Sequence, residues 1–176
     1  MSDLVWYFAY GSNMQPATFR GRRGIVAHRA VAARLDDWQL VLDKPPLLPI
    51  GGAMANVVPV PGAVVLGVAY AITPLDLEHV DLTEGVLIDN YRRVSVRVTA
   101  LGSSDVLDAF TLTSARRDPA LCPSRRYMTL LIEGAETHGL PADYVAWLRG
   151  LPAVEEHPEA SEARLLLDRT LKKEPR

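Results

Sequence analysis

The apolar, aromatic-rich run at residues 4–10 constrains the fold more than any other segment. It lacks the alternation of polar and apolar residues, which is typical of a strand covered on both faces. The triplet at residues 11–13 ends this run abruptly, and residues 14–20 can form a short helix capped by Asn13. We therefore expect the chain to begin with a central strand, a tight turn and a helix.

Further β-rich runs occupy the first two thirds of the chain. The proline–glycine pair at residues 61–62 suits a tight turn and predicts a hairpin, and residues 36–37 break another run into two strands. The pattern predicts about six or seven strands in all. Besides the first run, they are expected at residues 25–42 (two strands), 53–60, 64–72, 91–100 and 106–113.

Helices are expected mainly towards the end of the chain. The first follows Thr73 as N-cap and Pro74 as first helical residue, and it ends at Gly85. Strands thus precede most helices, which predicts an α+β fold: a mixed, largely antiparallel sheet curled into a small barrel with helices packed around it. The other predicted helices are residues 125–138, capped by Ser124, residues 141–149, and residues 159–172 with Leu165, Leu166 and Leu171 on an apolar face.

Composition narrows the class of protein. The chain has 176 residues, 48% hydrophobic and 23% charged, which predicts a single globular domain over residues 1–176 with a frayed tail near 172–176. A net charge of -2 provides no general positive field, so we expect no nucleic-acid partner. The short first apolar run and the absence of a basic start predict no signal peptide and no membrane association. With Cys122 as the lone cysteine, a reducing, cytoplasmic location is expected.

Two local patterns could carry chemistry. Tyr10, Gly11, Ser12 and Asn13 follow a buried strand, where successive backbone amides can bind an anion or a carbonyl oxygen. The alternative interpretation is that the triplet is only a turn with a helix cap. Glu84 is at a helix end, where the helix dipole and an apolar setting disfavour its charged form and suit a general acid or base. A solvated helix-end glutamate is the alternative interpretation.

Other constellations indicate little. The four histidines have no metal-ligand spacing and no nucleotide-binding glycine motif is present, so we expect neither a metal nor a cofactor. Four arginine pairs, beginning at residues 22, 92, 116 and 125, are expected to be solvated or ion-paired, unless one binds a substrate carboxylate.

Both local patterns occur together in one known family: the chain resembles the γ-glutamylcyclotransferases and their AIG2-like relatives. The resemblance begins with YFAYGSNM at residues 7–14 and continues over most of the length. The later matching segments are GVAY at 67–70, DLTEG at 81–85 with Tyr91 seven residues after the glutamate, PSRRY at 123–127 and GLPADY at 139–144.

The resemblance implies an enzyme that cyclises a γ-glutamyl amide to 5-oxoproline and releases the free amine, with Glu84 as general acid/base. It implies a small-molecule γ-glutamyl substrate and a monomer or homodimer. Phe110 stands where family members carry a tyrosine, and the proline-rich loop at residues 44–52 has no counterpart, so the leaving amine stays open. A non-catalytic AIG2-like binding or scaffold protein is the alternative. The substrate-binding residues implied are Tyr7, Tyr10, Gly11, Ser12, Asn13, Tyr91 and Tyr127.

Overall fold

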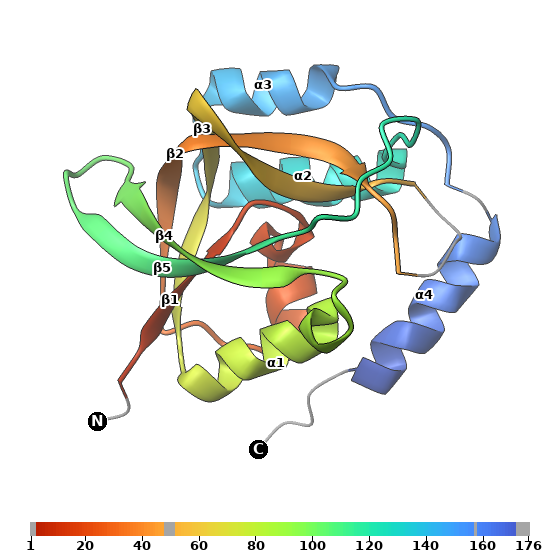
Figure 1. Cartoon of the computed structure of the whole chain (residues 1–176), viewed down its shortest axis with the longest axis horizontal. Coiled ribbons are helices and arrows are strands. Elements are labelled where there is room, and N and C mark those ends of the chain that lie inside the picture. The colour runs from red at the N-terminus through yellow and green to blue at the C-terminus, as the bar shows by residue number, and fades with distance from the viewer. Residues whose placement is uncertain (1–2, 48–51, 157, 172–176) are drawn as a thin grey trace.

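A closed five-stranded barrel forms the centre of the computed structural model, which describes residues 3–47, 52–156 and 158–171. The strands run in the order β1-β3-β2-β4-β5, and β1 closes the barrel by pairing in parallel with β5. All other neighbours are antiparallel, which confirms the predicted mixed barrel (Figure 1). The strands are β1 (Val5–Ala9), β2 (Arg29–Lys44), β3 (Met54–Ile72), β4 (Arg92–Ala100) and β5 (Val106–Thr113).

Four α-helices pack around this barrel. In Figure 1, α2 and α3 lie together on one side, α1 crosses the opposite side, and α4 stands apart at the edge. The barrel interior is fully apolar at positions such as Phe8, Val57 and Val65, which are completely buried. Burying such side chains is the main driving force for closing the barrel. The helices are α1 (Pro74–Glu84), α2 (Arg125–Thr137), α3 (Ala142–Gly150) and α4 (Pro158–Leu171).

Strands β2 and β3 correct the predicted strand count. Each is one long strand, where the sequence pattern predicted two, so the described residues form five strands rather than six or seven. The register shifts where Asp37 faces Gly62, and both have positive φ, 64° and 79°. The Gly62 amide donates to the Asp37 carboxylate at 2.8 Å. The residues predicted to form turns therefore form facing bulges within one antiparallel pair.

The structure confirms the predicted caps of helices α1 and α2. The Thr73 hydroxyl accepts a hydrogen bond from the Asp76 amide, and Gly85 ends α1 in the left-handed region with φ of 72°. Ser124 caps α2 in the same way as Thr73 caps α1. The predicted apolar face of α4 is wrong for Leu165 and Leu166, whose exposed fractions are 56% and 69%. The Leu171 side chain and the predicted frayed tail lie outside the described residues.

The segment after β1 differs from the predicted capped helix. It forms a 3-10 turn at Ser12–Met14 and then a π-helix at Ala17–Arg22. Asn13 makes no side-chain cap, because its amide is bonded to other buried side chains. Helix α2 packs directly on this turn: a Cβ at Gly134 would lie 2.7 Å from the Met14 Cβ. The glycine thus allows α2 to hold the turn against the barrel.

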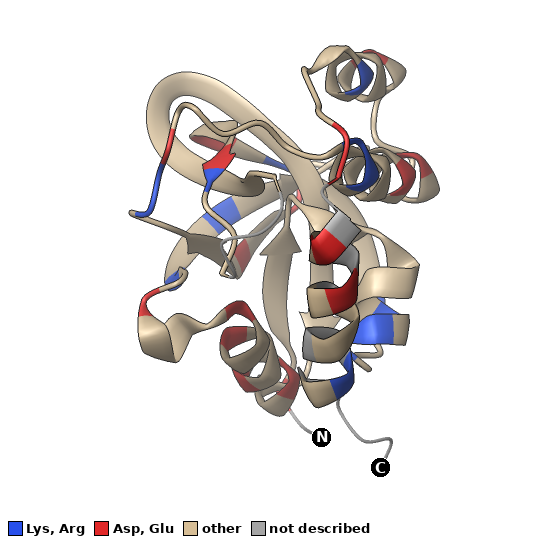
Figure 2. Ribbon diagram, turned by 90° about the vertical axis from the view of Figure 1, so that its right-hand side faces the viewer, with Lys and Arg blue, Asp and Glu red and all other residues tan. Residues whose placement is uncertain are grey.

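Charges of both signs are distributed along the chain, as Figure 2 shows. Helix α1 is an exception, because its charged residues are all acidic. Arginines from other elements face it: Arg93 of β4 lies 2.9 Å from the Asp81 carboxylate, and Arg23 lies 2.5 Å from that of Glu84. These ion pairs join α1 to the barrel and to the segment that follows β1.

Candidate active site

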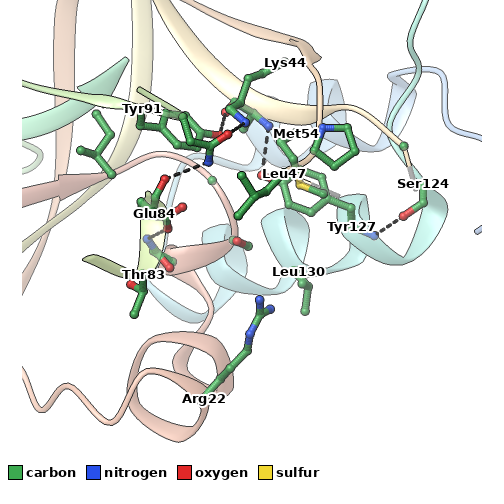
Figure 3. Close-up of a pocket in the computed structure, with 18 of the residues that line it drawn as sticks. Arg22, Lys44, Leu47, Met54, Thr83, Glu84, Tyr91, Ser124, Tyr127 and Leu130 are labelled. Carbon is green, nitrogen blue, oxygen red and sulfur yellow. Dashed lines mark hydrogen bonds between the residues drawn. The ribbon is translucent and has the colours of Figure 1, made fainter. Parts of the chain in front are cut away.

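A cavity of about 180 Å³ lies at one end of the barrel. Figure 3 shows side chains converging on it from the end of α1, the start of β4, helix α2 and the junction of β2 and β3. Segments from both ends of the chain contribute, from Tyr7 in β1 to Ala163 in α4. The cavity brings together all the site residues that the sequence singled out: Tyr7, Tyr10, Gly11, Ser12, Asn13, Glu84, Tyr91 and Tyr127.

The Glu84 carboxylate is hydrogen-bonded to side chains of the segment that follows β1. Its Oε1 accepts hydrogen bonds from Asn13 Nδ2 at 2.9 Å and from Arg23 Nη2 at 2.5 Å. Arg23 Nε in turn donates to Asn13 Oδ1 at 2.6 Å, so the three side chains form one satisfied network. The Glu84 side chain is 17% exposed, which excludes the solvated interpretation. The arginine stabilises the charged carboxylate against the helix dipole and burial, an effect that the local sequence did not predict.

Tyr7 extends this network into the barrel. Asn13 Nδ2 also donates to the Tyr7 hydroxyl at 2.9 Å. Burial and, to a smaller extent, the Glu84 charge raise the pKa of Tyr7 far above its usual value, so the phenol stays protonated. Its ring stacks with Phe19, which stacks with Tyr70 at 4.3 Å between centroids. The aromatic stack fixes the position of the Tyr7 hydroxyl, which shares the Asn13 amide with the Glu84 carboxylate.

Two tyrosines hold the start of β3 at the cavity wall. The Tyr91 hydroxyl donates to the Ala55 carbonyl at 2.7 Å, and the Tyr127 hydroxyl accepts from the Ala55 amide at 3.0 Å. A Cβ on Gly11 would lie 3.2 Å from both the Ala55 Cβ and the Tyr127 hydroxyl. The φ of Gly11 is −116°, so close packing, and not left-handed backbone, accounts for the glycine.

The cavity tyrosines cannot act as bases near neutral pH. Burial raises the pKa of Tyr127 to about 12, and burial together with the neighbouring phenols raises those of Tyr10 and Tyr91 well above their usual value. The Tyr10 hydroxyl donates to the Leu112 carbonyl at 2.5 Å. These groups therefore line the cavity as neutral rings and hydrogen-bonding groups.

Sequence reasoning missed three residues of the site. Arg23 belongs to an arginine pair that was singled out, but its partner is Glu84. Asn90 is 5% exposed, and its amide donates to the Glu84 carbonyl at 2.8 Å. Lys44, 1% exposed, donates to the Pro45 carbonyl and to Asn90 Oδ1, both at 2.7 Å. Burial and nearby Arg116 lower the pKa of Lys44 to about 8.

The proline-rich segment lies beside the cavity where the structure describes it. Pro46, Leu47 and Gly52 line the cavity, whereas residues 48–51 of the proline-rich loop lie outside the described residues. Phe110 does not line the cavity. Its ring lies below the Arg93 guanidinium, 5.2 Å from centroid to Cζ, so a missing hydroxyl there changes no cavity contact.

Within the described ranges, no group of three or more His, Cys, Asp and Glu side chains could hold a metal ion. No described helix is long and apolar enough to span a membrane.

The four arginine pairs each contribute at least one ion pair, as expected: Arg23 with Glu84, Arg93 with Asp81, Arg117 with Asp43, and Arg125 with Glu155.

A solved structure of a γ-glutamyl cyclotransferase superposes on this chain with a TM-score of 0.79 at 23% identity, covering 92% of this chain and 98% of that one. The barrel and its helices therefore have the cyclotransferase fold. The AIG2-like family model matches residues 64–148.

Sequence relatives extend this match to most of the chain. The γ-glutamyl cyclotransferase aclK of Aspergillus oryzae is 30% identical over 182 residues, covering 92% of this chain and 66% of that protein. The γ-glutamylcyclotransferase of Bos taurus is 29% identical over 160 residues, covering 89% of this chain and 83% of the relative. The chain belongs to the family of γ-glutamylcyclotransferases and AIG2-like proteins. The named relatives support an enzyme of the γ-glutamylcyclotransferase type.

Proposed function

We propose that this protein cyclises a γ-glutamyl amide to 5-oxoproline and releases the free amine, with Glu84 as general acid/base. The observation that carries the proposal is the position of the Glu84 carboxylate. It lies in the cavity wall, bonded to Asn13 of the loop that follows β1 and to Arg23. A carboxylate fixed in this way is oriented towards the cavity, as a general base must be.

The reaction needs no protein nucleophile, because the substrate supplies its own. Glu84 takes a proton from the substrate's α-ammonium group, and the freed nitrogen attacks the γ-carbonyl carbon of the same molecule. The ring C–N bond forms, Glu84 returns the proton to the departing nitrogen, and the C–N bond to the leaving amine breaks. The regenerated Glu84 carboxylate then takes the second N–H proton from the ring nitrogen, which gives the neutral lactam, and this proton passes to the free amine. The cavity contributes by holding the substrate folded, which removes most of the entropic cost of ring closure.

Stabilisation of the transition state would come from neutral donors. Backbone amides at Gly11 and Ser12 would bind the oxyanion or the α-carboxylate, since both residues line the cavity beside Glu84. Tyr7 and Tyr127 stay protonated and line the same cavity. We therefore assign the proton transfers to Glu84 and the orientation of the substrate to its uncharged neighbours.

The test is Glu84→Gln, which keeps the shape of the side chain and an oxygen acceptor for Asn13 and Arg23. We expect 5-oxoproline release from γ-glutamylalanine, measured by mass spectrometry, to fall about 100- to 10,000-fold with binding largely retained. Glu78→Gln is the matched control, because Glu78 is exposed on the same helix. Near-wild-type turnover by Glu84→Gln would exclude the assignment.

A panel of γ-glutamyl amino acids and γ-glutamyl amines tests the non-catalytic alternative. An enzyme of this type should release 5-oxoproline from at least one of them. Binding to the wild-type protein without release from any member of the panel would favour a small-molecule-binding protein instead.

A further inference from the structure

Lys44 is a buried cation whose partners in the described part of the chain are uncharged. It is 1% exposed and lines the same cavity as Glu84. Its ammonium donates to the Pro45 carbonyl and to Asn90 Oδ1, and it lies 4.6 Å from the centre of the Tyr91 ring. Burying an ammonium among neutral groups costs free energy unless a counter-charge compensates it.

The charges around Lys44 leave an excess of positive charge. Asn90 Oδ1 accepts from both Lys44 Nζ at 2.7 Å and Arg116 Nη1 at 2.8 Å, so two cations share one neutral oxygen. Among the described residues, no carboxylate lies within 4.0 Å of Nζ. Burial, above all, and the charge of nearby Arg116 lower the pKa of Lys44 to about 8, although the more distant Glu84 charge acts in the opposite direction.

The other buried charge of the cavity is already neutralised. The Glu84 carboxylate is paired with Arg23, and Arg126, which also lines the cavity, lies 4.0 Å from Glu156. An ammonium has three N–H donors, and neutral oxygens use two of those of Lys44. Among the described residues, one donor of Lys44 therefore has no hydrogen-bond partner and no carboxylate contacts its charge, so both are available to a ligand in the cavity, whose wall includes Lys44, as Figure 3 shows.

We infer that Lys44 binds a carboxylate of the substrate and thereby determines which γ-glutamyl compounds the cavity accepts. This inference rests on the proposed function. The carboxylate belongs either to the γ-glutamyl unit, as its α-carboxylate, or to an amino-acid leaving group. In both cases the ammonium gains a charge-assisted hydrogen bond and a carboxylate in direct contact, which no described side chain supplies.

The experiment measures binding in the Glu84→Gln background by calorimetry at pH 6.5, where Lys44 is charged. Three probes are titrated with and without Lys44→Met: γ-glutamylalanine, its C-terminal amide, and 4-aminobutanoylalanine, which lacks the α-carboxylate. We expect Lys44→Met to weaken the binding of γ-glutamylalanine by at least about tenfold, which is the usual effect of losing a charged hydrogen bond.

The other two probes identify the carboxylate. If the loss disappears with 4-aminobutanoylalanine, Lys44 binds the α-carboxylate; if it disappears with the C-terminal amide, Lys44 binds the leaving group. Equal losses with all three probes, or no loss with any, would overturn the inference. The inference would also be overturned if Arg22→Met, and not Lys44→Met, weakened binding, since Arg22 also lines the cavity.

Two controls separate binding from folding. Arg116→Gln removes the other cation on Asn90 at a residue that does not itself line the cavity, and it should leave all three affinities within about twofold. Lys44→Met should leave the thermal midpoint unchanged or raise it, because it removes a buried charge. A lower midpoint would show that Lys44 is a structural anchor. Because binding is measured without turnover, failure of the wild type to form 5-oxoproline would count against the proposed function alone.

Discussion

Glu84, Arg23 and Asn13 satisfy one another through three hydrogen bonds of 2.5 to 2.9 Å. A buried ion pair gains stability only when such additional bonds compensate its loss of water, and here Asn13 supplies them. Asn13 also donates to Tyr7, which ties the carboxylate to the barrel. At the scale of single residues, the site is thus a fixed carboxylate beside neutral donors.

Gly11→Ala tests how closely this site is packed. The new Cβ would lie 3.2 Å from Ala55 and from the Tyr127 hydroxyl, so we expect one or both to shift. The unfolding free energy should fall by about 1 to 3 kcal/mol and kcat/KM by roughly a hundredfold. Gly21→Ala is the control, because a Cβ there meets nothing within 4 Å. Urea denaturation and 5-oxoproline assays measure both quantities, and equal behaviour of the two variants would contradict the packing argument.

Local sequence patterns predicted part of the site and missed the rest for a physical reason. The residues of the loop after β1 are adjacent in the chain, and Glu84 precedes a helix-ending glycine, so local patterns identified both. Arg23 meets Glu84 across 61 positions, and Lys44 meets Asn90 across 46. Such pairs depend on strand register, which local patterns in one sequence do not specify.

At the scale of elements, helix α1 connects β3 to the catalytic candidate. The Thr73 hydroxyl accepts from the Asp76 amide and donates to the Asp76 carboxylate at 2.8 Å, which fixes the first turn. Glu84 occupies the opposite end of this helix. The N-cap thus determines where the helix starts, and therefore the position of the Glu84 carboxylate at its other end.

Thr73→Ala should therefore destabilise the protein by about 1 kcal/mol, the usual cost of losing an N-cap. The measurement is urea denaturation of both proteins. Thr129→Ala is the matched control, because Thr129 is exposed within α2 and its hydroxyl bonds only the carbonyl one turn earlier. The control should change stability by less than about 0.5 kcal/mol. A Thr73→Ala protein as stable as the control would show that the cap is dispensable.

The two long strands show where element prediction fails. Asp37 and Gly62 have the positive φ that tight turns require, and the same conformation also occurs in bulges. The choice between the two depends on whether the flanking strands pair with each other or with a common neighbour. Only the complete barrel decides that, so the capped helices were predictable and the strand boundaries were not.

At the scale of the whole molecule, the cavity is lined by segments distributed from Tyr7 to Ala163. A ligand that contacts all of them stabilises the native state by mass action, because none of these contacts survives unfolding. The chain's stability should therefore depend on ligand concentration.

We expect γ-glutamylalanine at one hundred times its dissociation constant to stabilise Glu84→Gln by about 2.7 kcal/mol. Thermal denaturation with and without the compound measures this. The isomer α-glutamylalanine is the control ligand, since its amide involves the other carboxyl group, and it should give a smaller shift. Equal shifts with both isomers would indicate that the cavity does not distinguish the γ-linkage.

The parallel pairing of β1 with β5 also determines when the protein can become active during its synthesis. Strand β1 emerges from the ribosome first, but its partner ends at Thr113, and Tyr127 follows later still. The cavity around the loop after β1 can therefore form only after most of the chain has been synthesised. A nascent chain released before α2 would carry Glu84 and the loop yet process no substrate.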